Sequence, residues 1–147
     1  MKKLLLFSFF ALAFTQSPYA QTANDGGQDE PVAKFKVEIT QSGKYKEYQR
    51  LVTLGSGMVY EGSTKQAIVL HDGDLKEDKY SFVSTDSLDV LEPSIQVGWY
   101  GNKKGDGKLE MKVYRNGELI DTQNVILKPE NSGQVQDNKW SYKAKKK

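Results

Sequence analysis

The residues best suited to chemistry in this chain lie in one short segment, His71-Asp72-Gly73-Asp74, which contains the only histidine. A histidine oriented by a carboxylate and placed near a serine is the arrangement of a nucleophilic catalytic triad. Serines follow at positions 81, 84 and 87, but none stands in a Gly-x-Ser-x-Gly sequence. Because Asp and Gly favour tight turns, we interpret the segment as a polar turn with a solvated histidine. We therefore predict no catalytic residue and a protein that is not an enzyme.

The same segment is a weak candidate for a metal site. Asp72 and Asp74 fit the first two alternating ligand positions of an EF-hand calcium loop, but Lys76 stands where the third oxygen ligand is needed. The chain has no cysteine and one histidine, which leaves no ordinary ligand set for zinc. We predict no metal and no cofactor, with adventitious calcium binding as the alternative.

A glycine-rich segment at positions 101–108 resembles a phosphate-binding loop in composition. Five residues, not four, separate Gly101 from Gly107, and Leu109 replaces the hydroxyl residue that would hold a metal. We interpret this segment as a flexible loop between two strands, whose lysines are available to an acidic partner.

The elements that position these residues are short strands, because apolar residues alternate along much of the chain. In 32–40, Phe35, Val37 and Ile39 point one way and charged residues point the other, which indicates a half-buried strand. After a turn at 41–44, a second strand is expected at 45–54. Its buried face would carry Tyr48, Val52 and Leu54. Further strands are expected at 66–70, 80–83, 88–91 and 95–99.

The clearest local feature is a hairpin at Asn116-Gly117, since both residues tolerate the positive φ of a type I′ turn. Such a turn pairs Arg115 with Glu118 and Tyr114 with Leu119. The same turn places Val113 opposite Ile120 and Lys112 opposite Asp121. The core face would then contain Leu109, Met111, Val113 and Ile120, joined by Val125 or Leu127 if the strand continues smoothly.

Seven or eight short strands without a helix predict an all-β fold, an antiparallel β-sandwich, with a small barrel as the alternative. The length of 147 residues fits one domain. We expect this domain to occupy residues 32–128, between a flexible linker at 21–31 and a basic, aromatic tail at 129–147.

The first 20 residues have the layout of a secretory signal peptide, with two lysines, an apolar run and then small or polar residues. The apolar run from Leu4 to Phe14 is shorter than the about 20 residues that span a bilayer, so the mature chain would have no transmembrane segment. We expect cleavage after Ala20, with Ala13 and Ala23 as alternatives, and a periplasmic or secreted protein.

Charge argues against nucleic acid as a partner. Without its signal peptide the chain is formally neutral, its body is mildly acidic, and its only arginines are Arg50 and Arg115. Nucleic-acid-binding domains usually carry a basic face rich in arginine.

Two groups of residues are candidates for binding. Tyr100, Tyr114 and Leu119 would lie on the outer face of one sheet, where tyrosine provides contact area with a polar tip. The alternative is that they pack beneath a loop. The tail combines aromatic residues with lysines, a pattern that suits an anionic surface, although a solvated tail with Trp140 docked on the domain is the alternative. Its candidate residues are Trp140, Tyr142, Lys143, Lys145, Lys146 and Lys147.

The functional interpretation is an exported, non-catalytic protein-interaction module. A protein partner in the cell envelope is expected, with the chain as an accessory subunit of an assembly such as a pilus or secretion machine. The alternative is a small β-scaffold that binds a lipid or glycan or inhibits an enzyme.

Overall fold

The strands of this protein form two facing sheets and a short two-stranded ladder. The computed structural model describes residues 32–99, 105–129 and 134–145, which all belong to the unit Pro31–Lys147. In spatial order, the five-stranded sheet contains β3 (Met58–Tyr60), β5 (Lys79–Ser84), β1 (Phe35–Gly43), β8 (Gly107–Arg115) and β9 (Glu118–Leu127).

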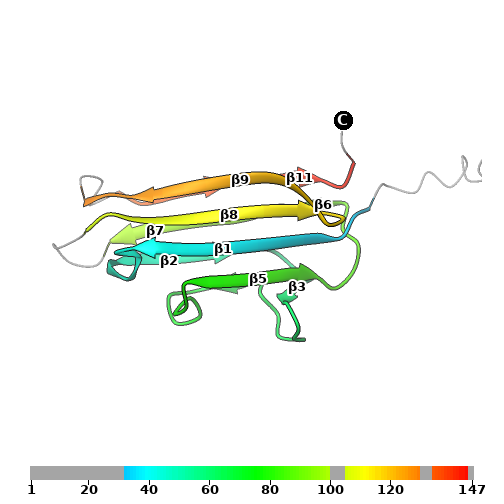
Figure 1. The fold of residues 1–147 in the computed structure, drawn as a ribbon, viewed down its shortest axis with the longest axis horizontal. Helices are drawn as coiled ribbons and strands as arrows, with labels where there is room; N and C mark the ends of the chain where they lie inside the picture. Colours follow the sequence, from blue (N-terminus) through cyan, green and yellow to red (C-terminus); the bar gives the residue numbers. More distant parts are fainter. Residues whose placement is uncertain (1–31, 100–104, 130–133, 146–147) are drawn as a thin grey trace, which may run out of the picture. The chain divides into compact units, whose positions relative to one another are not determined.

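The second layer is built from shorter strands. Its four-stranded sheet contains, in order, β10 (Gln136–Lys139), β7 (Ser94–Trp99), β2 (Tyr48–Thr53) and β4 (Val69–Leu70). Beside it, β11 (Tyr142–Lys143) pairs with β6 (Val90–Leu91). Figure 1 shows β9, β8, β1 and β5 in front of β7, β2, β6 and β11. All pairings between the described strands are antiparallel and close no barrel, so the predicted all-β sandwich is confirmed.

The core lies between the two layers, where the alternation of the sequence predicted it. The apolar side chains that β1, β8 and β7 turn inward are at most 2% exposed, namely Phe35, Val37, Ile39, Leu109, Met111, Val113, Ile95 and Val97. They meet Tyr48, Val52 and Leu54 from the second strand region, all buried as expected. Burying one such side chain stabilises the fold by about 1.5–3 kcal/mol, so these strands fix the positions of the loops between them.

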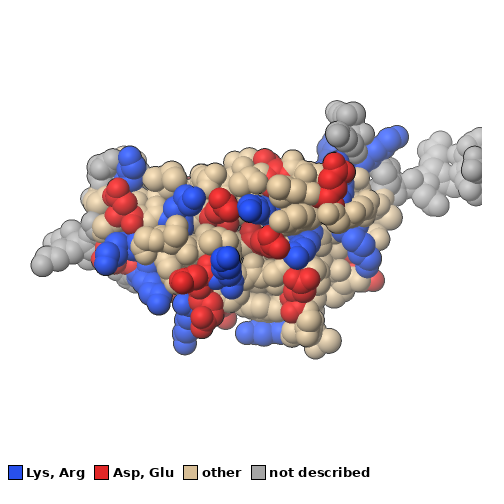
Figure 2. Space-filling model, in the orientation of Figure 1, with Lys and Arg blue, Asp and Glu red and all other residues tan. Residues whose placement is uncertain are grey.

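On its outer face the five-stranded sheet carries charges of both signs. Figure 2 shows lysine, arginine and acidic side chains interspersed over this face. Lys36 lies 3.1 Å from Glu38 and 3.4 Å from Glu61, and Glu110 lies between Lys108 and Lys112. Such exposed pairs contribute little stability individually. Because charges of both signs are interspersed, the described residues of this face form no extended positive or negative patch that would attract a charged ligand.

The Asn116-Gly117 hairpin forms as predicted, but its register holds for two pairs only. Asn116 and Gly117 have φ of 50° and 83°, and Tyr114 pairs with Leu119. The register then shifts, so the expected pairing of Val113 with Ile120 is wrong; Asp121 lies opposite Val113, and Thr122 rather than Asp121 lies opposite Lys112.

The cause of the shift is a β-bulge in which Ile120 is the extra residue. Ile120 is half-buried and packs at the margin of the core. Beyond it, Val125 and Leu127 are buried as expected. The bulge turns Asp121 inward, where its carboxylate accepts hydrogen bonds from Gln123 and Tyr142.

The turn expected at 41–44 comes later than predicted. β1 continues to Gly43, because Gln41 is buried and its side chain hydrogen bonds to the carbonyls of Leu75 and Glu77. Gly43 has a φ of 67°, and the short 3₁₀ helix η2 (Tyr45–Glu47) then leads into β2.

The expected tail at 129–147 is wrong for the part that the structure describes. Residues 136–139 pair with β7, and 142–143 pair with β6. Trp140 and Tyr142 are half-buried against the core. For Trp140 this agrees with the alternative prediction, in which its side chain docks on the domain. An edge strand needs no strict apolar alternation, which explains why the pattern did not show it.

The predictions for residues 1–20 and 21–31 lie outside the described residues. Within the described ranges, no helix has the length and apolar character needed to cross a membrane.

Candidate functional site

The Asn116-Gly117 hairpin and the C-terminal strand enclose a hollow that we call the β9–β11 groove. Its volume is about 390 Å³. It is lined by residues from β8, β9 and the segment around β11, namely Arg115, Glu118, Leu119, Ile120, Ser141, Tyr142, Lys143 and Lys145.

The hairpin register positions the arginine of this groove. Arg115 is one place beyond Tyr114 and therefore follows Val113 on the inward side of β8. Its Nη1 donates a 2.9 Å hydrogen bond to the carbonyl of Lys143, which ties the hairpin to β11. A guanidinium has several N–H donors in a planar fork, so this one bond leaves donors for a carboxylate or phosphate.

The lining of the groove combines apolar and charged side chains. Leu119 is 47% exposed, while Ile120 and Tyr142 are half-buried against the core. Lys143 and Lys145 are exposed, and Glu118 is an acidic residue of the same lining. This arrangement can bind a ligand that has an apolar portion beside a negative charge.

Tyr142 is held in place by a hydrogen bond across the gap between the sheets. Its hydroxyl donates to Asp121 Oδ2 at 2.7 Å. Burial, together with this bond to a carboxylate, raises the pKa of Tyr142 above its usual value. Burial alone would raise the pKa of Asp121, but hydrogen bonds from Tyr142, Gln123 and the Thr122 backbone outweigh it and lower that pKa. Asp121 therefore stays ionised and orients the tyrosine ring.

The structure brings together four of the residues singled out from sequence: Leu119, Tyr142, Lys143 and Lys145. Tyr114 lies opposite Leu119, as expected, but its hydroxyl donates a 2.8 Å hydrogen bond to Glu38 on the outer face of the sheet. That bond raises the pKa of Tyr114 and is the main cause of the lowered pKa of Glu38.

Trp140 lies in a separate hollow with Glu92, Pro93, Ser94 and Lys139. Its backbone N–H donates to the carbonyl of Pro93 at 3.1 Å. Tyr100, Lys146 and Lys147 lie outside the described residues.

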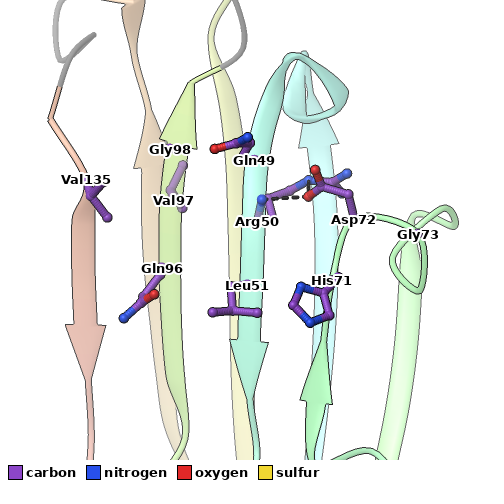
Figure 3. A pocket seen from close by; sticks show the side chains of 10 residues that line it. All are labelled: Gln49, Arg50, Leu51, His71, Asp72, Gly73, Gln96, Val97, Gly98 and Val135. Atoms are coloured by element: carbon purple, nitrogen blue, oxygen red, sulfur yellow. Dashed lines mark hydrogen bonds and ion pairs between the residues drawn. The ribbon is translucent and has the colours of Figure 1, made fainter.

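A second hollow, the β2–β7 groove, lies on the outer face of the four-stranded sheet and has a volume of about 410 Å³. Figure 3 shows Gln49 and Leu51 of β2 beside Gln96 and Gly98 of β7, with His71 at one side and Val135 at the other. Gly98 pairs with Gln49 and has no side chain, and the Gln49 side chain lies over it, with Oε1 3.0 Å from where a Cβ would stand. Its lining includes one carboxylate, that of Asp72, and the buried guanidinium of Arg50.

The buried Arg50 is the functional-looking residue that the sequence analysis missed. It is 6% exposed, and its Nη1 donates to Gln41 Oε1 at 2.6 Å and to the Leu75 carbonyl at 3.0 Å. Asp72 Oδ1 accepts the Arg50 backbone N–H at 2.6 Å and lies 3.5 Å from its Nε (Figure 3). The signal was present, because Arg50 alternates with Tyr48 and Val52 on the buried face of β2.

This network explains the His71-Asp72-Gly73-Asp74 segment. Asp72 anchors the turn to Arg50, and Asp74 Oδ2 accepts the His71 backbone N–H at 3.0 Å. Ser84 lies at the far end of β5, where it is buried and its hydroxyl accepts the Phe35 N–H at 3.0 Å. Within the described ranges, no group of three or more His, Cys, Asp or Glu side chains is placed to hold a metal ion. Asp72 thus holds the turn to β2, and Asp74 accepts a hydrogen bond within the turn.

Comparison with known proteins identifies the fold. No protein-family model and no curated protein matches the chain. A solved structure of the calcium-bound form of a protein from Parabacteroides distasonis has a TM-score of 0.65 at 21% identity. That match covers 78% of this chain and 98% of the solved one.

Two further solved structures belong to the domain of unknown function DUF4425. The Bacteroides vulgatus domain has a TM-score of 0.62 at 11% identity, over 80% of this chain and 99% of the solved one. The Bacteroides ovatus protein has a TM-score of 0.58 at 13% identity, and the match covers 78% of this chain and 98% of the solved one. At these identities the likeness establishes a shared sandwich fold.

Proposed function

We propose that the protein is an exported, non-catalytic interaction module that binds a protein partner of the cell envelope through the β9–β11 groove. Export is supported by the lysines and apolar run of residues 1–20. Binding is supported by one observation: Leu119 and Tyr142 meet Arg115, Lys143 and Lys145 in a single hollow at the edge of the sandwich. Tyrosine and arginine are enriched in protein interfaces, where they combine apolar contact with hydrogen bonding.

The charge of the groove indicates the charge of the partner. Three cationic side chains and one carboxylate line it. A partner with an acidic segment would be attracted to this surface, and the attraction would weaken with salt. We assign the chain the role of an accessory subunit in an envelope assembly, such as a pilus or secretion machine.

The test is partner recovery from native envelopes with matched charge reversals. Lys143→Glu combined with Lys145→Glu reverses two charges of the groove. Lys76→Glu combined with Lys79→Glu reverses two exposed charges elsewhere. We expect the control variant to recover one stoichiometric partner in affinity purification. The groove variant should recover at least ten-fold less of that partner. Equal recovery by both variants contradicts the proposal.

A small-ligand function is the second candidate, and the β2–β7 groove favours it. The amides of Gln49 and Gln96 both line this hollow, and amides both donate to and accept from sugar hydroxyls. A native mass spectrum of the purified protein tests this function. A co-purified glycan that is lost in a Gln96→Ala variant supports it, and an unmodified mass in both proteins contradicts it.

A further inference from the structure

The edge of β9 is the longest unpaired strand edge in the described part of the protein. β9 has ten residues and pairs with β8 alone. The other outer strands of the two main sheets, β3, β4 and β10, have three, two and four residues. Proteins protect long edges with lysine, proline, bulges or inward-pointing charges, and β9 contains no lysine or proline. Its bulge and the inward Asp121 protect only the end beside the hairpin, so the backbone beyond them offers a template for another strand.

The bulge at Ile120 divides this edge into two parts. From Thr122 to Leu127 the ladder with β8 is regular, which leaves six residues as the pairing template. On the outer face, Ile126 is 45% exposed and Leu119 is 47% exposed. An incoming strand with alternating apolar residues would cover Ile126 and then leave the edge at the bulge, beside Leu119.

The direction of such a strand follows from the pairing of the sandwich. The described strands pair antiparallel throughout, and antiparallel addition to β9 places the carboxyl-terminal end of the incoming segment near Glu118 and Leu119. That is the end at which Arg115, Lys143 and Lys145 line the β9–β11 groove. A guanidinium binds a carboxylate through two parallel hydrogen bonds, so an acidic carboxyl-terminal end fits this position.

We propose that the partner contributes an extended segment that adds antiparallel to β9 and places its acidic carboxyl-terminal end in the β9–β11 groove. This inference specifies the binding mode of the function proposed above and rests on it. It combines main-chain pairing, which provides affinity, with the charged groove, which selects direction and sequence.

The test uses synthetic peptides and the intact protein. The parent probe is a decapeptide of alternating threonine and valine that ends in Glu-Asp-Glu with a free carboxylate. The matched control has the same composition with the acidic residues at its amino-terminal end. We expect the parent to bind at least ten-fold more tightly than the control, and Lys143→Glu with Lys145→Glu to remove this preference.

Two further probes separate strand addition from charge attraction. Two versions of the parent carry N-methyl groups on alternate residues, one version on the odd and one on the even positions. Only one set of N–H groups faces β9, so one version should lose at least ten-fold in affinity and the other should not. Three results would overturn the inference. The parent peptide does not bind, or it binds no more tightly than the control with the acidic residues at its amino-terminal end. The third is equal affinity of the parent and both methylated versions.

Phosphatidylglycerol vesicles test the competing occupant, a membrane surface. Vesicle binding that depends on Lys143 and Lys145, with no binding of the parent peptide, also overturns the inference. If the peptides fail while the groove variant still loses its envelope partner, strand addition is wrong and the proposed function stands.

Discussion

The hydroxyl of Tyr142 lies 2.7 Å from Asp121 Oδ2 and joins the C-terminal strand to the edge strand of the opposite sheet. The bond exists because the bulge at Ile120 turns Asp121 inward. It holds in place the tyrosine that lines the β9–β11 groove. Stability and the shape of the candidate site thus depend on the same contact.

Replacing Tyr142 with Phe should lower the free energy of unfolding by about 1–2 kcal/mol at pH 7, because the bond is made to a charged group. Asp121 has a pKa below its usual 3.8 in the folded protein. The unfolded chain therefore binds more protons as the pH falls, and the stability from this carboxylate is lost below about pH 4. Urea unfolding at pH 7 and pH 3 measures both effects.

The stabilising effect of the same bond is also lost at high pH. The pKa of Tyr142 is raised above its usual 10.0 in the folded protein, so its stabilising effect is present below pH 10 and lost as the pH rises further. The difference between wild type and Tyr142→Phe should therefore be largest near neutral pH and shrink on both sides. A difference that stays constant from pH 3 to pH 7 contradicts the assigned role of Asp121.

Arg50 should be among the most sensitive polar residues of the fold. Arg50→Met leaves Gln41 Oε1 and the Leu75 carbonyl without this donor in a buried environment. Removing one partner from such a network costs about 3 kcal/mol. A double-mutant cycle with Gln41→Leu should show a coupling of about 1 kcal/mol or more. A loss below 1 kcal/mol for Arg50→Met would show that the network adds little to stability.

His71→Ala should leave stability and partner binding intact. The side chain of His71 is exposed, whereas its backbone N–H is the group that Asp74 binds. Asp74→Ala is the matched comparison and should cost about 1 kcal/mol, since it removes the acceptor within the turn. Partner recovery and thermal unfolding of both variants check this. Loss of function in a folded His71→Ala protein would revive the catalytic interpretation of the segment.

Gly117→Val should destabilise the protein by about 1 kcal/mol or more. Gly117 has a φ of 83°, a conformation that a β-branched residue resists. Gly73→Val is the control, because Gly73 is also exposed and a Cβ there meets no atom within 4 Å. If both substitutions lower the free energy of unfolding equally, the turn conformation is not the reason for the loss.

Alternation in the sequence was sufficient to predict the strands that face the core. Phe35, Val37 and Ile39 are spaced so that one register buries all three, and a shift by one residue would expose them. Val97 follows the same rule in the opposite sheet. Burial of apolar side chains dominates these elements, so local pattern and final structure agree.

The features that escaped prediction depend on partners distant in the chain. The bulge at Ile120 turns a carboxylate inward, and its hydrogen-bond donor Tyr142 lies 21 residues after Asp121. The polar strand β10 forms by pairing with β7, and nothing in its own pattern indicates this. For the site, the sequence analysis named Leu119, Tyr142 and the lysines as binding candidates because of their residue types. Only the fold shows that they line the same groove.

The central claim is that the β9–β11 groove is the surface that binds the partner, and a photo-crosslinker tests it in place. A benzoylphenylalanine residue is introduced at Leu119 in one protein and at Val69 in another. Both positions are exposed on edge strands, at 47% and 45%, but Val69 lies on β4 at the far edge of the other sheet. Illumination of native envelopes should yield one discrete protein adduct from position 119 and none from position 69. An adduct of the same mass and yield from both positions, or from position 69 alone, contradicts the account.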